Sequence, residues 1–152
     1  MSQQFPILAY GKNRPAQHEP SPYGYTDSKQ DVWVHGYVMY GDDYSPYIIE
    51  GDDSIIATLL HIKTEDYRIV LSCSDSGEGF HSEGNSFNMN DRKLVTVETE
   101  DGPVQAWLYV ASTKTREQYM SGMTVLESGD WLRHLTEKKD AEFRAEMALS
   151  RW

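Results

Sequence analysis

The segment that spans residues 92–111 constrains the fold of this chain most. Two strand-like stretches, 92–99 and 104–111, flank the sequence Glu100-Asp101-Gly102-Pro103. That four-residue sequence is a strong turn signal, and two apolar stretches around such a signal are typical of a β-hairpin. The sequence therefore predicts a β-sheet, which further strand-like stretches are expected to extend, at about 31–40, 46–50 and 54–62.

The rest of the chain is expected to supply one more strand, helices and loops. Phe5–Asn13 predicts a strand that ends in a turn, and Thr136–Ser150 has apolar residues at helical spacing. Thr64–Ser74 fits a helix, although its central residues fit a strand equally well. Arg14–Lys29 is rich in Pro, Ser, Gln and Gly and predicts a long loop or lid, and 75–91 is also predicted to be a loop. These elements together predict an α+β fold.

The composition limits the classes of partner. A length of 152 residues suits a single domain, 1–152, with one sizeable core. The net charge of 14 − 24 = −10 repels phosphate backbones and anionic lipids, so neither a nucleic acid nor a membrane is an expected partner. No stretch approaches the ~18 apolar residues of a membrane span, and the N-terminal residues do not resemble a signal peptide. The single cysteine, Cys73, has no internal disulfide partner, which favours a cytoplasmic location.

Glu78 is the first candidate for catalytic chemistry. It lies between two glycines in Asp75-Ser76-Gly77-Glu78-Gly79-Phe80, just after an apolar run. Because glycines leave the neighbouring space open, Glu78 is able to face a cavity, and partial desolvation there raises the pKa of a carboxyl group toward the range of a general base. The alternative is a loop with an exposed glutamate.

A second candidate site lies near the N-terminus. The strand-like run from Phe5 ends in the turn Tyr10-Gly11-Lys12-Asn13. Gly11 allows successive backbone N–H groups to point in one direction, which makes a binding site for a carboxylate or another anion.

These two motifs, in this order, resemble those of the γ-glutamylcyclotransferase-like (AIG2-like) family. The similarity extends over roughly residues 5–134, through Val34–Met39, Tyr44–Gly51, Ile55–Ile62, the predicted hairpin and Ser128-Gly129-Asp130-Trp131. The resemblance implies a small mixed or antiparallel β-barrel with flanking helices, one of which occupies Thr64–Ser74. It also implies an acyl-transfer reaction in which a γ-glutamyl amide or amine cyclises to 5-oxoproline and releases its amine.

The resemblance assigns roles to particular residues. The backbone amides of Tyr10, Gly11, Lys12 and Asn13 are expected to bind the α-carboxylate of the small-molecule γ-glutamyl substrate. Glu78 is expected to move the proton as the α-amine attacks the γ-amide carbonyl, and Tyr47 is expected to contact the substrate. No cofactor or metal is implied, and the five histidines show no metal-ligand spacing.

The sequence departs from the family pattern at two positions. Lys12 replaces a small residue in the turn, and Asn90 stands where the family commonly has a tyrosine. Both changes favour a non-catalytic protein of the same fold that binds a small anion or an amino-acid derivative. A protein-interaction module that uses loops 14–30 and 80–91 is a third possibility. Glu78 favours the enzyme, because a pocket that merely binds a carboxylate gains nothing from a second negative charge.

Overall fold

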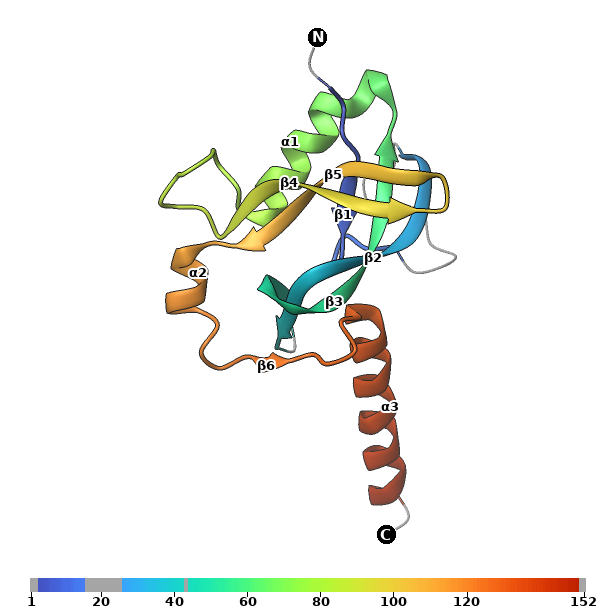
Figure 1. Cartoon of the computed structure of the whole chain (residues 1–152). Coiled ribbons are helices and arrows are strands. Elements are labelled where there is room, and N and C mark those ends of the chain that lie inside the picture. The colour runs from blue at the N-terminus through green and yellow to red at the C-terminus, as the bar shows by residue number, and fades with distance from the viewer. Residues whose placement is uncertain (1–2, 16–25, 43, 151–152) are drawn as a thin grey trace.

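The computed structural model describes residues 3–15, 26–42 and 44–150, and it has an α+β fold (Figure 1). Its strands form one mixed, curled six-stranded sheet in the order β4-β5-β1-β3-β2-β6, a half-barrel. The strands are β1 (Ile7–Ala9), β2 (Thr26–Gly41), β3 (Pro46–Ile62), β4 (Asn90–Thr99), β5 (Gly102–Ala111) and β6 (Thr124–Val125). The helices are the 3₁₀ helix η1 (Thr64–Asp66), α1 (Tyr67–Glu78), α2 (Thr113–Gln118) and α3 (Trp131–Leu149).

The long hairpin of β2 and β3 lies between β1 and β6 in the sheet. Its antiparallel register runs from Thr26 opposite Ile62 to Gly41 opposite Pro46. Alternate residues of β2 point inward, as period-two strands require, so Val32 and Val34 are buried. β1 pairs antiparallel with β3 and parallel with β5, which makes the sheet mixed.

Side chains on the two faces of β1 enter two different hydrophobic clusters. One cluster includes residues of α1 and the other includes the start of α3, so β1 contributes to the packing of both helices. Leu8 packs inside the curl, together with Trp131 from the first turn of α3. Ile7 and Leu60 pack on the opposite face against Tyr67 and Val70 of α1. Burial of this apolar surface holds α1 on the sheet, so its C-terminal residue has a fixed position.

Several expected boundaries are wrong. The predicted strands 46–50 and 54–62 form one continuous strand, β3. The predicted loop 75–91 begins too early, because Asp75–Glu78 form the last turn of α1 and the helix ends at Gly79. The predicted loop 14–29 ends too late, because β2 begins at Thr26. The residues on which the lid prediction mainly rests, 16–25, lie outside the described residues.

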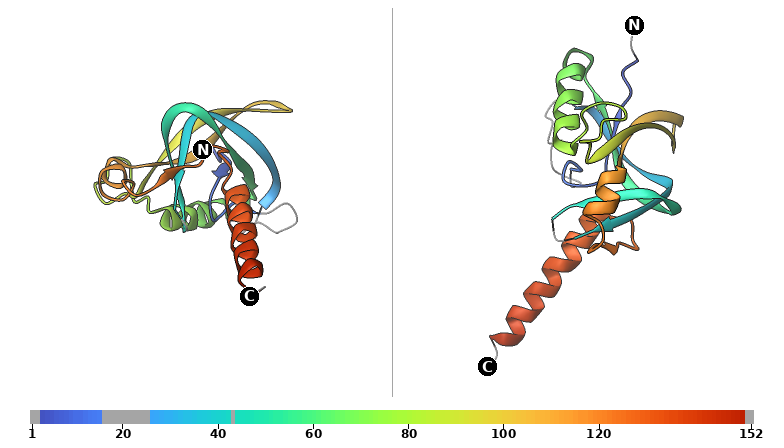
Figure 2. Two further views of the ribbon diagram at one scale, coloured as in Figure 1. Left: turned by 90° about the horizontal axis from the view of Figure 1, so that it is seen from below. Right: turned by 90° about the vertical axis from the view of Figure 1, so that its left-hand side faces the viewer.

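Helix α3 begins five residues before the prediction and leaves the body of the protein. The Asp130 side chain accepts a hydrogen bond from the Arg133 N–H and caps the helix, and Trp131 is buried directly after it. Residues 139–150 are all exposed, and Figures 1 and 2 show this part of α3 extending away from the sheet. The expectation of flanking helices is confirmed, and the distal half of α3 lies away from the sheet. Within the described ranges, no helix has both the length and the apolar character needed to cross a membrane.

Candidate active site

The turn after β1 packs tightly against the start of β3. Tyr10 is buried, and its hydroxyl donates a hydrogen bond of 2.6 Å to the Tyr109 carbonyl. The Arg14 N–H donates to the Gly11 carbonyl at 3.0 Å and closes the turn. A Cβ atom at Gly11 would lie 3.0 Å from a ring carbon of Pro46. This position therefore favours glycine because of close packing.

Arg14 holds this turn in place through side-chain contacts with three other segments, a role that the sequence did not predict. Its side chain is buried, and its guanidinium donates to the Thr58 hydroxyl at 3.2 Å and to the Asp130 carboxylate at 2.8 Å. A longer ion pair of 3.5 Å joins it to Asp31. Arg14 therefore links the turn to β2, to β3 and to the residue that caps α3.

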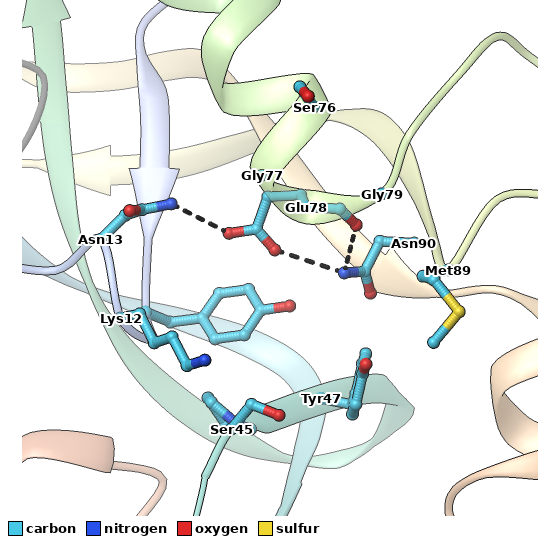
Figure 3. Close-up of a pocket in the computed structure, with 13 residues that line it drawn as sticks. Lys12, Asn13, Ser45, Tyr47, Ser76, Gly77, Glu78, Gly79, Met89 and Asn90 are labelled. Atoms are coloured by element: carbon cyan, nitrogen blue, oxygen red, sulfur yellow. Dashed lines mark hydrogen bonds between the residues drawn. The ribbon is translucent and has the colours of Figure 1, made fainter.

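Glu78 is the last residue of α1, and glycine ends the helix directly after it. Gly79 has φ 69°, a left-handed conformation that glycine adopts without strain. The Glu78 carboxylate receives one hydrogen bond on each oxygen (Figure 3). The Asn13 side-chain amide lies 3.4 Å from Oε1, and the Asn90 amide lies 3.3 Å from Oε2. The end of α1, the turn after β1 and the start of β4 thus meet at this carboxylate.

The surroundings of Glu78 change its acidity. Burial is the main cause that raises the pKa of Glu78 to about 7, while the Asn13 hydrogen bond and the positive charge of Lys12 act in the opposite direction. Burial, reinforced by the charge of Glu78, also raises the pKa of the Tyr10 and Tyr47 hydroxyl groups. Near neutral pH both phenols are therefore neutral, while Glu78 is poised between its two protonation states.

These side chains line a cavity of about 450 Å³. The structure brings all six residues predicted from the sequence to its wall: Tyr10, Gly11, Lys12, Asn13, Tyr47 and Glu78. Met89 and Asn90 complete one side, and Ser45 and Pro46 complete another. The cavity size suits a small molecule, and its wall combines backbone from the turn, one ammonium group and one carboxylate.

Asn90 is a lining residue whose contact with Glu78 the sequence did not predict. Its position was marked only by the absence of the family's tyrosine, yet its amide contacts Glu78 directly. Lys12 is exposed at the rim, where its charge acts on both Glu78 and Asp42. Among the described residues, no three His, Cys, Asp or Glu side chains are grouped to bind a metal.

The aspartate of the Asp75–Phe80 motif has a structural role, because its carboxylate is engaged by residues of β4 and β5. Asp75 forms an ion pair with Arg92 and accepts a hydrogen bond of 2.7 Å from the Tyr109 hydroxyl. The Arg92 guanidinium also lies 4.9 Å from the centre of the Phe80 ring and 4.4 Å from that of Trp107. This cluster fastens the last turn of α1 to β4 and β5, and it thereby supports Glu78.

Two solved structures share this fold. An uncharacterized protein, PH0828, from Pyrococcus horikoshii aligns with a TM-score of 0.55 and 21% identity, over 90% of this chain and 97% of its own. Protein ytfP from Escherichia coli aligns with a TM-score of 0.54 and 23% identity, over 84% of this chain and 96% of its own. At these identities the likeness concerns the fold alone. No curated protein matches the chain at a significant level.

A protein family also matches most of the chain. Residues 7–133 match the family described as "Gamma-glutamyl cyclotransferase, AIG2-like". This range begins at β1 and ends in the first turn of α3, so it includes every residue that lines the cavity. Because the match covers most of the chain, the protein belongs to the gamma-glutamyl cyclotransferase, AIG2-like family.

Proposed function

We propose that this protein is an acyl-transfer enzyme that converts a γ-glutamyl amide or amine to 5-oxoproline and releases the amine. The observation that carries the proposal is Glu78. Its carboxylate faces a cavity that the turn Tyr10–Asn13 also lines, and burial raises its pKa to about 7. A group with a pKa near the working pH is both a competent base and a competent acid.

The two sides of the cavity suit the two charged ends of the γ-glutamyl group. The backbone N–H groups of the turn bind the α-carboxylate, and the Lys12 ammonium adds positive charge beside it. The α-ammonium group then lies near the Glu78 carboxylate, and Tyr47 borders the substrate from β3. Binding in this folded conformation brings the α-nitrogen close to the γ-carbonyl carbon, which supplies much of the acceleration of an intramolecular reaction.

In the proposed reaction Glu78 carries protons one at a time. It first accepts a proton from the α-ammonium group, and the freed amine attacks the γ-carbonyl carbon to form the ring C–N bond. The tetrahedral intermediate then collapses, and the bond to the leaving nitrogen breaks as Glu78 protonates that nitrogen. After a second transfer from the ring nitrogen, the amine leaves as an ammonium ion and Glu78 is again a carboxylate.

The proposal includes no cofactor, because nucleophile and electrophile belong to one substrate. It includes the expectations that residues 1–152 form one domain and that the protein acts in the cytoplasm, where the exposed Cys73 thiol stays reduced. The partner is a small molecule, in keeping with the net charge of −10.

Release of 5-oxoproline tests the proposal. The wild type is offered γ-glutamyl amides and amines, and the Glu78→Gln variant is assayed beside it. Since positioned acid–base groups contribute about 10²–10⁴-fold, the variant should lose that factor in turnover while substrate binding changes little. Glu83→Gln, at an exposed loop position, is the matched control and should retain wild-type turnover. Equal turnover in wild type and Glu78→Gln would remove Glu78 from the reaction.

Lys12 favours a second candidate function. An ammonium group at the anion-binding turn suits a protein that holds a small anion or amino-acid derivative without converting it. Calorimetry distinguishes the two: tight binding of γ-glutamyl compounds with no 5-oxoproline released supports the binding protein and contradicts the enzyme.

A further inference from the structure

We propose that Asn90 is a positioning residue that orients the Glu78 carboxylate and stabilises its ionised, proton-accepting form. The inference rests on the proposed function of Glu78 and adds a residue to it.

Both polar contacts of the Asn90 amide nitrogen go to Glu78. Nδ2 donates to the Glu78 main-chain carbonyl at 3.0 Å and to Oε2 of its carboxylate at 3.3 Å (Figure 3). The opposite orientation of the side chain would place an amide oxygen against two oxygen acceptors. The direction of the amide is therefore determined by its surroundings, and its N–H groups face Glu78.

The oxygen of the same amide shows that this orientation of Asn90 is energetically unfavourable in one respect. Asn90 is 4% exposed, and within the described residues its Oδ1 is buried without a hydrogen-bond partner. A buried carbonyl oxygen without a partner is unfavourable, and such groups are rare in folded proteins. A cost of this kind is tolerated where the placement of the side chain serves a function. Here the placement directs both N–H groups at the candidate catalytic residue.

The backbone beside Asn90 is held firmly enough for such a role. The Met89 N–H donates to the Gly79 carbonyl at 2.8 Å, directly after the end of α1. The Met89 carbonyl accepts from the Thr115 hydroxyl at 2.5 Å and from the Ser112 N–H at 3.1 Å. Asn90 itself pairs with Ala111 at the start of the β4–β5 ladder. These bonds fix the position of Asn90 relative to the end of α1.

Asn13 and Asn90 each donate to one oxygen of the Glu78 carboxylate, but they are held differently. Asn13 lies on a turn, is half-buried and donates to Oε1 at 3.4 Å. Asn90 is buried at the start of β4, donates to Oε2 at 3.3 Å and also donates to the Glu78 main-chain carbonyl at 3.0 Å. Burial disfavours the charged form of Glu78, and hydrogen bonds donated to the carboxylate favour it. Loss of the Asn90 amide should therefore shift the titration of Glu78 upward.

Several charged or titratable groups face Glu78 from the elements around it. Lys12, on the turn after β1, favours the ionised carboxylate. Tyr10 from the same turn and Tyr47 from β3 are neutral phenols in the pH range concerned. Asp75, one turn earlier on α1, is engaged by Arg92 from β4. A substitution at Asn90 leaves all of these groups in place, so its effect on Glu78 is separable from theirs.

The direct test is a ¹³C NMR titration of the Glu78 carboxyl carbon, assigned by its absence from the Glu78→Gln spectrum. Asn90→Leu, of similar volume, should raise the titration midpoint of Glu78 by about one unit, since a donor to the charged form is lost. Asn90→Asp, the same shape with a second carboxyl group, should raise it further and give a two-step titration. Asn85→Asp, in the loop before β4 and bonded to Phe87 and Ser82, should leave the midpoint unchanged.

A kinetic measurement on the same variants gives the functional readout. In these variants the acid limb of the pH dependence of kcat/KM should move to higher pH by the same amount as the NMR midpoint. The rate should be recovered when the pH is raised.

An unchanged Glu78 midpoint in folded Asn90→Leu, or in Asn90→Asp if the first variant does not fold, contradicts the inference. Because the NMR titration needs no turnover, the two proposals fail separately. A shifted midpoint without 5-oxoproline release contradicts only the enzyme, and release with an unshifted midpoint contradicts only the role of Asn90.

Discussion

At the scale of single residues, the two glycines beside Glu78 have different structural roles. The sequence suggested that both open the space around the carboxylate. Gly77 instead lies inside the last turn of α1, where a Cβ atom would meet nothing within 4 Å. Gly79 ends the helix with φ 69°, and a Cβ there would lie 2.8 Å from the Met89 side chain. Gly79 is thus required by geometry, and Gly77 is not.

This difference predicts opposite effects of the same substitution. Gly77→Ala should stabilise the protein by about 0.5–1 kcal/mol, since alanine restricts the unfolded chain and favours a helix. Gly79→Ala should destabilise it by about 1–2 kcal/mol from the left-handed conformation alone, with a further cost from the contact with Met89. Urea unfolding measures both, and equal changes of the same sign would contradict the assignment.

At the scale of elements, Arg14 connects the turn Tyr10–Asn13 to the rest of the fold. Its bond to Asp130 joins residues that are 116 positions apart, and Asp130 also caps α3. The side chain of Arg14 is 6% exposed and that of Asp130 is 24% exposed, so solvent screens this ion pair only in part. The position of the turn therefore depends on where α3 begins.

Removal of this link should affect substrate binding more than chemistry. Arg14→Met should destabilise the protein by about 1–3 kcal/mol, because Asp130 loses its partner in a partly buried site. It should also raise KM more than it lowers kcat, because in the proposed function the turn binds the α-carboxylate and Glu78 carries the proton. Arg133→Met, which breaks an exposed helical pair with Glu137, is the control and should cost about 0.5 kcal/mol or less. A loss confined to kcat in Arg14→Met would contradict this role.

Elements with local signals were predictable from the sequence, and those fixed by distant contacts were not. The predicted strands 92–99 and 104–111 agree with β4 and β5 to within two residues, because a turn signal separates them. The end of α1 differs from the prediction because 75–91, with the two glycines beside Glu78, was predicted to be a loop, whereas tertiary packing extends the helix through Gly77. The family motifs located Glu78 and the turn after β1. The contacts of Arg14 reach residues up to 116 positions away, and those of Asn90 cross the loop between α1 and β4, so no local pattern encodes them.

At the scale of the whole molecule, the curl of the sheet creates the site. The order β4-β5-β1-β3-β2-β6 would place β3 and β4 far apart in a flat sheet, yet Glu50 of β3 pairs with Lys93 of β4 at 2.9 Å. Glu50 also pairs with Arg116 of α2 at 2.6 Å. The hydrogen bond from Lys93 is the main cause that lowers the pKa of Glu50 to about 2, so this link stays ionised across the working pH range. The same curl brings Tyr47 of β3 to one cavity with Asn90 of β4.

The pH dependence of 5-oxoproline release by the wild-type protein tests the central claim most directly. If Glu78 must be ionised to accept the proton, kcat/KM should rise with pH and reach half its plateau near the pKa of about 7 that burial gives this group. The rise should disappear in Glu78→Gln together with most of the rate. An acid limb near the ordinary pKa of glutamate, about 4.3, or a rate independent of pH between 5 and 8, would contradict the account.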